Sequence, residues 1–417
     1  MLEVKDYDET RDMDLEAGAW RNYVFSQPPE VDQPTYKIVG PTERVDGRDY
    51  IFARIALDEG GDWYNEYYSR HPELKESDDK SRHRGRQLGE KMLLERPITE
   101  QMAIATFSRA WIFGRPDYFK HFARMKVMPT GAKPNPKKAI PDPRQMTRKI
   151  KAFCLYLGAG RVRIARLDKR WVYSHAPAPE YGKPYDPEID YPYVICIAFP
   201  QNPYYLRNHT SWGVNLEVGW KYSFGSFVSF AVADFIKRMG WNARPSSTTN
   251  TPYLVPPLFI DCGIGEDARC GYTLTKEFGN SWRPGGIMTD LPLIPDRPVD
   301  FGLQDFCEKC GICAEACPAG AIPKGGRSVV RGYLKWQSHA DKCYAYWSSI
   351  GRTCGICQAV CPWSHGNNFL HRSIREIGQR FPGLRKLLLK GEELFYKRQP
   401  RPDPEWLSEK VDFTYQP

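Results

Sequence analysis

The chain has 417 residues, of which 41% are hydrophobic and 26% are charged, and its formal net charge is +9. These proportions are ordinary for a folded globular protein, and they exclude a disordered or fibrous chain. No run of 18 apolar residues occurs, so no transmembrane segment is expected. The opening residues, MLEVKDYDET, lack a signal-peptide core, which favours a cytoplasmic protein; an exported protein whose signal has been removed would leave the same evidence.

Residues 1–145 are expected to form an irregular, polar N-terminal segment with mainly helical secondary structure. Helical periodicity occurs in Arg48–Ala56 and in Glu90–Phe113. The proline-rich stretch Met128–Pro143 that follows predicts a loop or a domain boundary.

Positive charge is concentrated between Lys120 and Arg170, where 15 Lys and Arg residues stand against two acids, Asp142 and Asp168. Such a run usually forms a solvated surface. A docking face for an acidic electron donor or for a nucleic acid is the alternative. The interleaved aromatic and basic residues typical of nucleic-acid binding are missing, so we favour the solvated surface and expect no nucleic acid partner.

Residues 146–300 contain both predicted strands and predicted helices and are expected to form an α/β (α+β) core. Strands are predicted at Arg161–Asp168 and Tyr193–Pro200, and a helix closed by glycine at Met146–Gly160. A second helix is predicted at Lys221–Trp241. Its apolar face is expected to contain Phe224, Phe227, Val228, Ala231 and Phe235.

Residues 301–365 contain eight cysteines in two runs that each end in C-P. The first run is C-x2-C-x2-C-x3-C and the second is C-x10-C-x2-C-x3-C. They comprise Cys307, Cys310, Cys313 and Cys317, then Cys343, Cys354, Cys357 and Cys361. This spacing is typical of a domain with two [4Fe-4S] clusters, whereas structural zinc sites use pairs of C-x2-C. We therefore predict two clusters, with Cys343 on a separate loop because of its long gap.

The other four cysteines are scattered through apolar or turn-like segments, and no disulfide framework is expected beside a metal motif of this kind. We predict that they are buried as small hydrophobic residues. They are Cys154, Cys196, Cys262 and Cys270. Residues 366–417 are expected to form a tail that wraps the body, with one basic amphipathic helix at Phe369–Phe381.

Taken together, several segments resemble the reductive dehalogenases, a cobalamin-dependent enzyme family with two [4Fe-4S] clusters. The resemblance runs from about Arg48 to Trp363, and the shared order of the segments makes it specific. The segments are RDYIFAR, YYSRHPELKE, the predicted helix KYSFGSFVSFAVADFIKRMGW, GIGEDARCGYTLTKEFG, MTDLPLIPDRPVDFG and both cysteine runs.

The resemblance implies a nitroreductase-like core that binds cobalamin in its base-off form, followed by a domain like a bacterial two-cluster ferredoxin. The absence of a D-x-H-x-x-G motif agrees with base-off binding. Resemblance of the cysteine runs to those of two-cluster ferredoxins implies that the cysteines are shared crosswise between the clusters. One cluster takes Cys307, Cys310, Cys313 and Cys361, and the other takes Cys317, Cys343, Cys354 and Cys357.

The implied activity is removal of halide from a small organohalide, with electrons from an external low-potential donor such as a ferredoxin or flavodoxin. The family's proton donor is a tyrosine at the start of a helix, which matches Tyr222. Its basic partner falls in FGNSWRPGGI, where Arg283 is the only cation. A gapless match to some members places Ser281 at that position instead.

Two other functions remain open from the sequence. An enzyme like epoxyqueuosine reductase would also use cobalamin and two clusters but would act on transfer RNA, which the basic stretch would suit. A non-enzymatic electron-transfer subunit would hold the clusters without binding cobalamin. The long N-terminal segment and the MTDLPL segment favour the dehalogenase.

Overall fold

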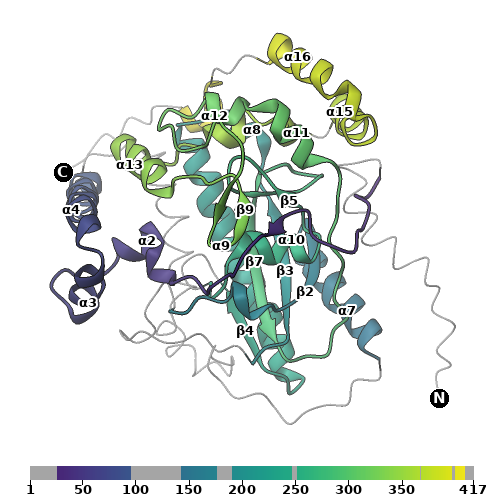
Figure 1. The fold of residues 1–417 in the computed structure, drawn as a ribbon, viewed down its shortest axis with the longest axis horizontal. Helices are drawn as coiled ribbons and strands as arrows, with labels where there is room; N and C mark the ends of the chain where they lie inside the picture. The colour runs from purple at the N-terminus through teal and green to yellow at the C-terminus, as the bar shows by residue number, and fades with distance from the viewer. Residues whose placement is uncertain are drawn as a thin grey trace, which may run out of the picture.

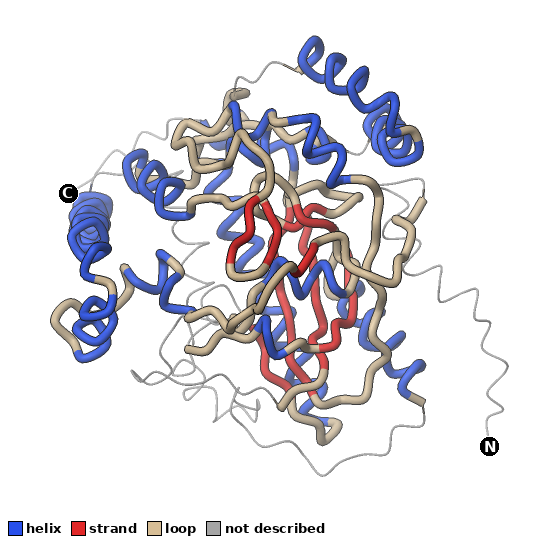
Figure 2. The backbone as a smooth tube through the Cα atoms, viewed as in Figure 1, coloured by secondary structure: helices blue, strands red, loops and turns tan. Residues whose placement is uncertain are grey.

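A computed structural model describes residues 26–94, 142–175, 190–246, 251–366, 368–396 and 400–408. Within these ranges a four-stranded antiparallel sheet lies at the centre of the molecule (Figures 1 and 2). Its strands run in the order β2-β3-β7-β4. They are β2 (Arg161–Arg166), β3 (Tyr193–Pro200), β7 (Trp282–Thr289) and β4 (Ala243–Ser246). The fold is therefore mixed helix and sheet, and the two predicted strands are confirmed.

Strand β3 is apolar along its whole length because both faces of the sheet are covered. Alternate residues point to opposite faces of a strand. Ile195 and Ile197 join the hydrophobic core on one face, and Val194, Cys196 and Ala198 join the core on the other. A strand buried on both sides reads as a continuous apolar run, as YVICIAFP does.

Helices α7 (Pro143–Tyr156) and α9 (Trp212–Arg238) cover one face of the sheet. Helix α10 (Val255–Asp261) lies on the other face. Helix α8 (Pro203–Leu206) leads from β3 into α9. Three short elements complete this part: η3 (Lys169–Trp171), β5 (Glu266–Asp267) and β6 (Thr273–Leu274).

The expected start of α9 is wrong. The helix begins at Trp212 rather than Lys221, so Tyr222 lies in the middle of the helix and not at its head. Val214 and Val218 extend the helical spacing towards the N-terminus, and they pack with Leu206 in a small separate cluster. Val214 and Val218 lie about five full turns before Val232 and Ile236 and so on the same side of the helix, but their neighbours are Leu206 and Tyr222 and not the sheet.

The expected buried face of α9 is also partly wrong. Phe227 is 51% exposed, while Val228, Val232 and Ile236 are buried against the sheet. Phe224 and Phe235 are partly buried at the edge of this core. The β-branched residues, which are short and stiff, lie closest to the sheet, and the larger rings close its margin.

The cysteine region packs as a set of short helices above the sheet (Figure 1). These are α11 (Leu303–Cys310), α12 (Ile312–Glu315), α13 (Ala340–Ile350), α14 (Ile356–Ala359) and η4 (Pro362–Ser364). A hairpin of β8 (Ser328–Val330) and β9 (Tyr333–Lys335) connects them, and β1 (Lys37–Ile38) adds to its edge. The N-terminal segment is thus hydrogen-bonded to the cysteine region.

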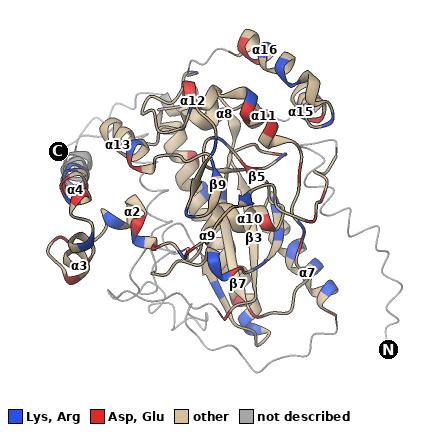
Figure 3. Ribbon diagram, viewed as in Figure 1, with Lys and Arg blue, Asp and Glu red and all other residues tan. Residues whose placement is uncertain are grey.

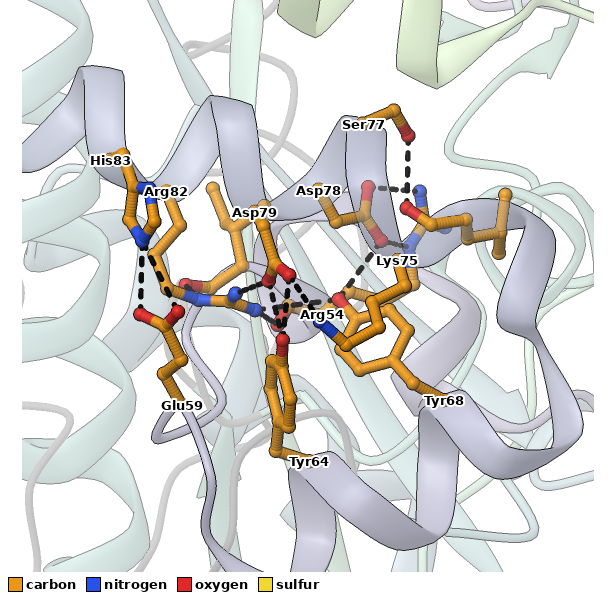
Figure 4. A network of polar contacts seen from close by, with 12 residues as sticks. Arg54, Glu59, Tyr64, Tyr68, Lys75, Ser77, Asp78, Asp79, Arg82 and His83 are labelled. Carbon is orange, nitrogen blue, oxygen red and sulfur yellow. Dashed lines mark hydrogen bonds and ion pairs between the residues drawn. The ribbon is translucent and has the colours of Figure 1, made fainter.

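The N-terminal helices contact helix α13, which carries Cys343. They comprise η1 (Gly47–Asp49), α2 (Ile51–Arg54), α3 (Asp62–Arg70) and α4 (Pro72–Leu94). Phe52 packs against Tyr344 and Trp347 of α13, with ring centroids 5.1 and 5.0 Å away. Arg54 bridges Asp78 of α4, at 2.8 Å, and Asp341 of α13, at 2.5 Å. Figure 4 shows Arg54 and Asp78 within the polar network that joins these helices.

The C-terminal tail contains α15 (Phe369–Arg380), η5 (Pro382–Leu384), α16 (Arg385–Phe395) and α17 (Glu405–Ser408). The helix expected at Phe369–Phe381 is confirmed, and α15 is anchored by the ion pair of Lys276 with Glu376 at 3.0 Å. None of the helices in the described part of the chain is long and apolar enough to cross a membrane.

The basic stretch is partly internal. Residues 120–141, and most of the helix expected at Glu90–Phe113, lie outside the described residues. In the described part, Figure 3 marks Lys and Arg positions on α7 and along the sheet in blue. Arg161 is buried in an ion pair with Glu277, and Arg163 pairs with Glu30 and Asp296. These cations stabilise the fold and do not form a free docking face.

Replacing Asp78 tests the polar network at the N-terminal helices. Asp78→Ala removes the buried partner of Arg54, and we expect the free energy of unfolding to fall by about 3 kcal/mol because a buried charge loses its partner. Urea denaturation measures this loss. Glu76→Ala is the control, since its pair with Lys80 is fully exposed and its loss should leave stability almost unchanged. Equal effects of both substitutions would contradict the assignment.

A second prediction concerns the two matching glycines of the cysteine runs. Gly311 and Gly355 both adopt left-handed backbone, with φ of 68° and 69°, and alanine there costs about 1–2 kcal/mol. A Cβ on Gly355 would also lie 2.9 Å from Cγ1 of Val214, whereas one on Gly311 meets nothing within 4 Å. Gly355→Ala should therefore lower the denaturation midpoint more than Gly311→Ala does. Gly391→Ala in α16 is the control and should leave the denaturation midpoint unchanged or raise it. A larger loss of stability in Gly311→Ala than in Gly355→Ala would contradict this account.

Candidate active site and iron–sulfur centre

Five cysteines from both runs line one small cavity in the cysteine region. They are Cys307, Cys310, Cys313, Cys357 and Cys361. The first three come from α11 and α12, Cys357 comes from α14, and Cys361 follows α14. Cys270, Arg269 and Trp363 also line the wall. The cavity thus gathers the four residues that the resemblance assigns to one cluster, together with Cys357, which the resemblance assigns to the other.

The cysteines assigned to the other cluster lie near one another. The surrounding protein raises the pKa values of the Cys343 and Cys354 thiols, and a nearby Cys317 raises each of them further, although the side chain of Cys343 is exposed. Cys357 interacts with all three. The long gap of the second run places Cys343 on the separate helix α13, not on a loop. Within the described residues, no three His, Cys, Asp or Glu side chains are placed to share a single metal ion. A cubane is a different case, since each thiolate binds its own iron.

Tyr222 and Arg283 come together at the junction of α9 and β7. The guanidinium of Arg283 lies over the Tyr222 ring, 5.3 Å from its centroid. Arg283 is positioned by two donated hydrogen bonds, to the carbonyl of Trp282 at 3.0 Å and to Oε1 of Gln358 at 3.4 Å. Ser281, the alternative partner, is fully buried beside this strand. The geometry therefore favours Arg283 over Ser281 as the neighbour of Tyr222.

Two further tyrosines border the same place. Tyr50 and Tyr272 are 48% and 51% exposed, yet burial is the leading cause that raises their pKa values. Tyr222, Arg283 and Cys343 lie close enough to influence the pKa values of both phenols, and Tyr173 also influences that of Tyr50. We call this place, bounded by Tyr50, Tyr173, Tyr222, Tyr272 and Arg283, the tyrosine recess.

A buried acid lies close to the tyrosine recess. Glu217, one turn before Tyr222 on α9, accepts a hydrogen bond from the backbone N–H of Asn202 at 2.7 Å. Burial raises its pKa above the usual range, while Lys221 and Arg283 oppose that shift. The two nearby cations therefore offset part of the free-energy cost of a buried carboxylate.

A chain of hydrogen bonds connects Arg283 to both cysteine groups. Gln358, which accepts from Arg283, donates to the carbonyl of Asn280 at 2.7 Å. Asn280 donates to the carbonyl of Cys357 at 3.2 Å and accepts from Ser364 Oγ at 2.6 Å. Ser364 in turn donates its backbone N–H to the carbonyl of Cys361 at 2.9 Å. The recess and the cysteine loops therefore form one rigid unit.

Sequence reasoning missed several residues of this site. Tyr50 lies in a segment that shows only helical periodicity, and nothing in the pattern places it near Tyr222. Cys270 is buried as expected, but it also lines the cysteine cavity and accepts a hydrogen bond from Asn280 at 3.6 Å. Gln358 carried a weak signal, since it is a large polar residue inside a run of small and apolar ones.

Comparison with known proteins identifies the cysteine region. The family of 4Fe-4S dicluster domains matches residues 306–365. The tetrachloroethene reductive dehalogenase of Sulfurospirillum multivorans is 32% identical over 267 residues, which cover 56% of this chain and 53% of that protein. The tetrachloroethene reductive dehalogenase of Dehalobacter restrictus is 31% identical over 222 residues, covering 50% and 40%. The chain spans about half the length of these curated relatives.

An epoxyqueuosine reductase from Salmonella typhimurium is 33% identical, but over only 129 residues, or 30% of this chain and 32% of that protein. A solved reductive dehalogenase, reported with a mechanism for B12-dependent dehalogenation, covers 88% of this chain and 49% of its own. It superposes with a TM-score of 0.70 at 25% identity. The resemblance expected from the sequence is thereby confirmed: the chain is a homologue of the reductive dehalogenases and carries a 4Fe-4S dicluster domain.

Proposed function

We propose that this protein is an oxidoreductase that removes halide from a small organohalide, using cobalamin and two [4Fe-4S] clusters. The contact between Tyr222 and Arg283, beside a recess that adjoins the cysteine groups, is the observation that carries this proposal. The net reaction consumes two electrons and one proton: the carbon–halogen bond breaks, halide leaves, and the carbon gains hydrogen.

The tyrosine recess fits the implied cofactor. Phenol rings from four separate segments lie near one another and beside Arg283, and aromatic rings of this kind suit a corrinoid and an apolar substrate. No D-x-H-x-x-G motif supplies a lower ligand, so we propose base-off binding. When bound, the cobalt of cobalamin supplies the reducing electrons at the carbon–halogen bond.

Tyr222 is proposed to donate the proton from its hydroxyl to the carbon that loses halide. Arg283 favours the phenolate that results, because a cation lies over the ring that has become negatively charged. Solvent protons then restore the phenol. Gln358 supports this step by holding the guanidinium in place. Tyr222 and Arg283 are thus a catalytic pair with separate tasks.

Two cysteine groups are proposed to hold the clusters in the crosswise arrangement. The group of Cys317, Cys343, Cys354 and Cys357 is the one near the recess, since Cys343 and Cys357 influence Tyr272. We therefore propose that an external low-potential donor, such as a ferredoxin or flavodoxin, reduces the other group first. The donor, a cytoplasmic location and the proposed domain boundaries after residues 145, 300 and 365 remain predictions.

Substitution of Tyr222 tests the proton step. Tyr222→Phe should lower the rate of halide release by about 10²-fold to 10⁴-fold, because a positioned general acid is lost, while iron and corrinoid content stay unchanged. The assay is anaerobic, with reduced viologen and a panel of aryl and alkyl halides. Tyr204→Phe is the control, since this tyrosine is exposed on α8. Wild-type rates in Tyr222→Phe would refute the assigned role.

Serine substitutions test the cluster assignment. Cys361→Ser and Cys343→Ser should each reduce the iron content from about eight to about four per chain, because each cluster loses a ligand. Crosswise sharing predicts that the electron paramagnetic resonance spectrum of Cys361→Ser matches that of Cys307→Ser and not that of Cys343→Ser. Cys270→Ser is the control and should retain all the iron. A match between Cys361→Ser and Cys343→Ser would show that each run holds its own cluster.

A further inference from the structure

Arg269 is a buried cation that the proposed reaction does not use. Its side chain lines the cavity that also contains Cys307, Cys310, Cys313 and Cys361. The residue is only 4% exposed. It is carried by the loop between β5 and β6, outside the cysteine runs. It lies within the segment GIGEDARCGYTLTKEFG, but the sequence alone assigns this arginine no role.

The guanidinium of Arg269 is saturated with hydrogen bonds, but all of its acceptors are neutral. Nε donates to the carbonyl of Cys307 at 3.0 Å, and Nη2 donates to that of Glu308 at 3.4 Å. Nη1 donates to the carbonyls of Pro323, Lys324 and Gly325 at 3.0, 3.2 and 2.7 Å. These bonds fix its position beside the cavity without neutralising its charge.

No carboxylate compensates this charge in the part of the chain that the structure describes. Among the described residues no carboxylate lies within 4.0 Å of Arg269, whereas three of the other buried arginines, Arg48, Arg54 and Arg161, each pair with an acid. A second cation, Arg327, lies over the same Trp336 ring that Arg269 contacts, at 4.4 and 5.2 Å. Burial of an unpaired cation is costly, so a negative group is expected close by.

We propose that Arg269 is the charge partner of the first cluster, the one assigned to Cys307, Cys310, Cys313 and Cys361, and that it raises the reduction potential of this cluster. The inference rests on the proposed function, which supplies the cluster. Four thiolates make the cluster negative, and reduction adds a further negative charge. A fixed cation at low dielectric therefore stabilises the reduced state more than the oxidised state. Arg269 thus makes the first cluster a ready electron acceptor.

The test is a potentiometric titration of the iron-loaded protein with dithionite, followed by electron paramagnetic resonance. In Arg269→Gln the ratio of reduced to oxidised first cluster at a given potential should fall at least tenfold, a shift of about 59 mV to more negative values for one electron. The second cluster should shift less. Arg269→Lys retains the charge and should keep the potential near that of the wild type.

Lys309→Gln is the matched control. Lys309 lies between two cysteines on α11, but it is partly exposed and paired with Asp305 at 2.6 Å, so solvent screens its charge and the potential should not change. If Arg269→Gln fails to assemble its iron, Arg327→Gln replaces it, with a smaller negative shift expected. An unchanged potential in the variant that assembles would overturn the inference.

An equal negative shift in Arg269→Lys and Arg269→Gln would also overturn it, since the hydrogen-bond geometry and not the charge would then set the potential. These outcomes leave the proposed function intact, because the wild type still holds both clusters. A wild-type protein that takes up no iron–sulfur cluster would instead overturn the proposed function and this inference with it.

Discussion

The close packing of cysteine ligands beside a partly buried phenol and guanidinium is the constraint on which the site depends. Charges inside a protein require fixed partners, and here the backbone and a few side chains provide them. Asn280 and Gln358 are central, because they bond to the loops that carry Cys357 and Cys361 and also to Arg283. A direct chain of hydrogen bonds therefore connects the cysteine groups to the tyrosine recess.

The rest of the fold serves to bring remote segments to this point. The antiparallel sheet holds Arg283 at the start of β7, and α9 packs on the sheet and presents Tyr222. The N-terminal segment supplies Tyr50 and then contacts α13 through Phe52 and Arg54. The same few residues thus border the recess and brace the helix that carries Cys343, so a change at either place is expected to affect the other.

The sequence predicts the cysteine spacing and the apolar strand better than it predicts which distant residues meet at the site. The cysteine spacing and the apolar run of β3 depend on local geometry, and both could be predicted. The pairing of Tyr222 with Arg283 followed from the family resemblance, and the structure places the two in contact. The start of α9 could not be predicted, because Val214 and Val218 pack on a different neighbour from the rest of the helix. Tyr50 and Arg269 join the site through tertiary contacts alone, which no local spacing records.

The central claim is that two iron–sulfur clusters and a corrinoid share this single chain. Its most direct test is a count of iron, acid-labile sulfide and cobalt in protein reconstituted anaerobically and freed of unbound cofactor. The account predicts about eight irons, about eight sulfides and about one cobalt per chain, with the absorbance of base-off cobalamin. Full iron and sulfide without cobalt would leave only an electron carrier, and zinc in place of iron and sulfide would contradict the account altogether.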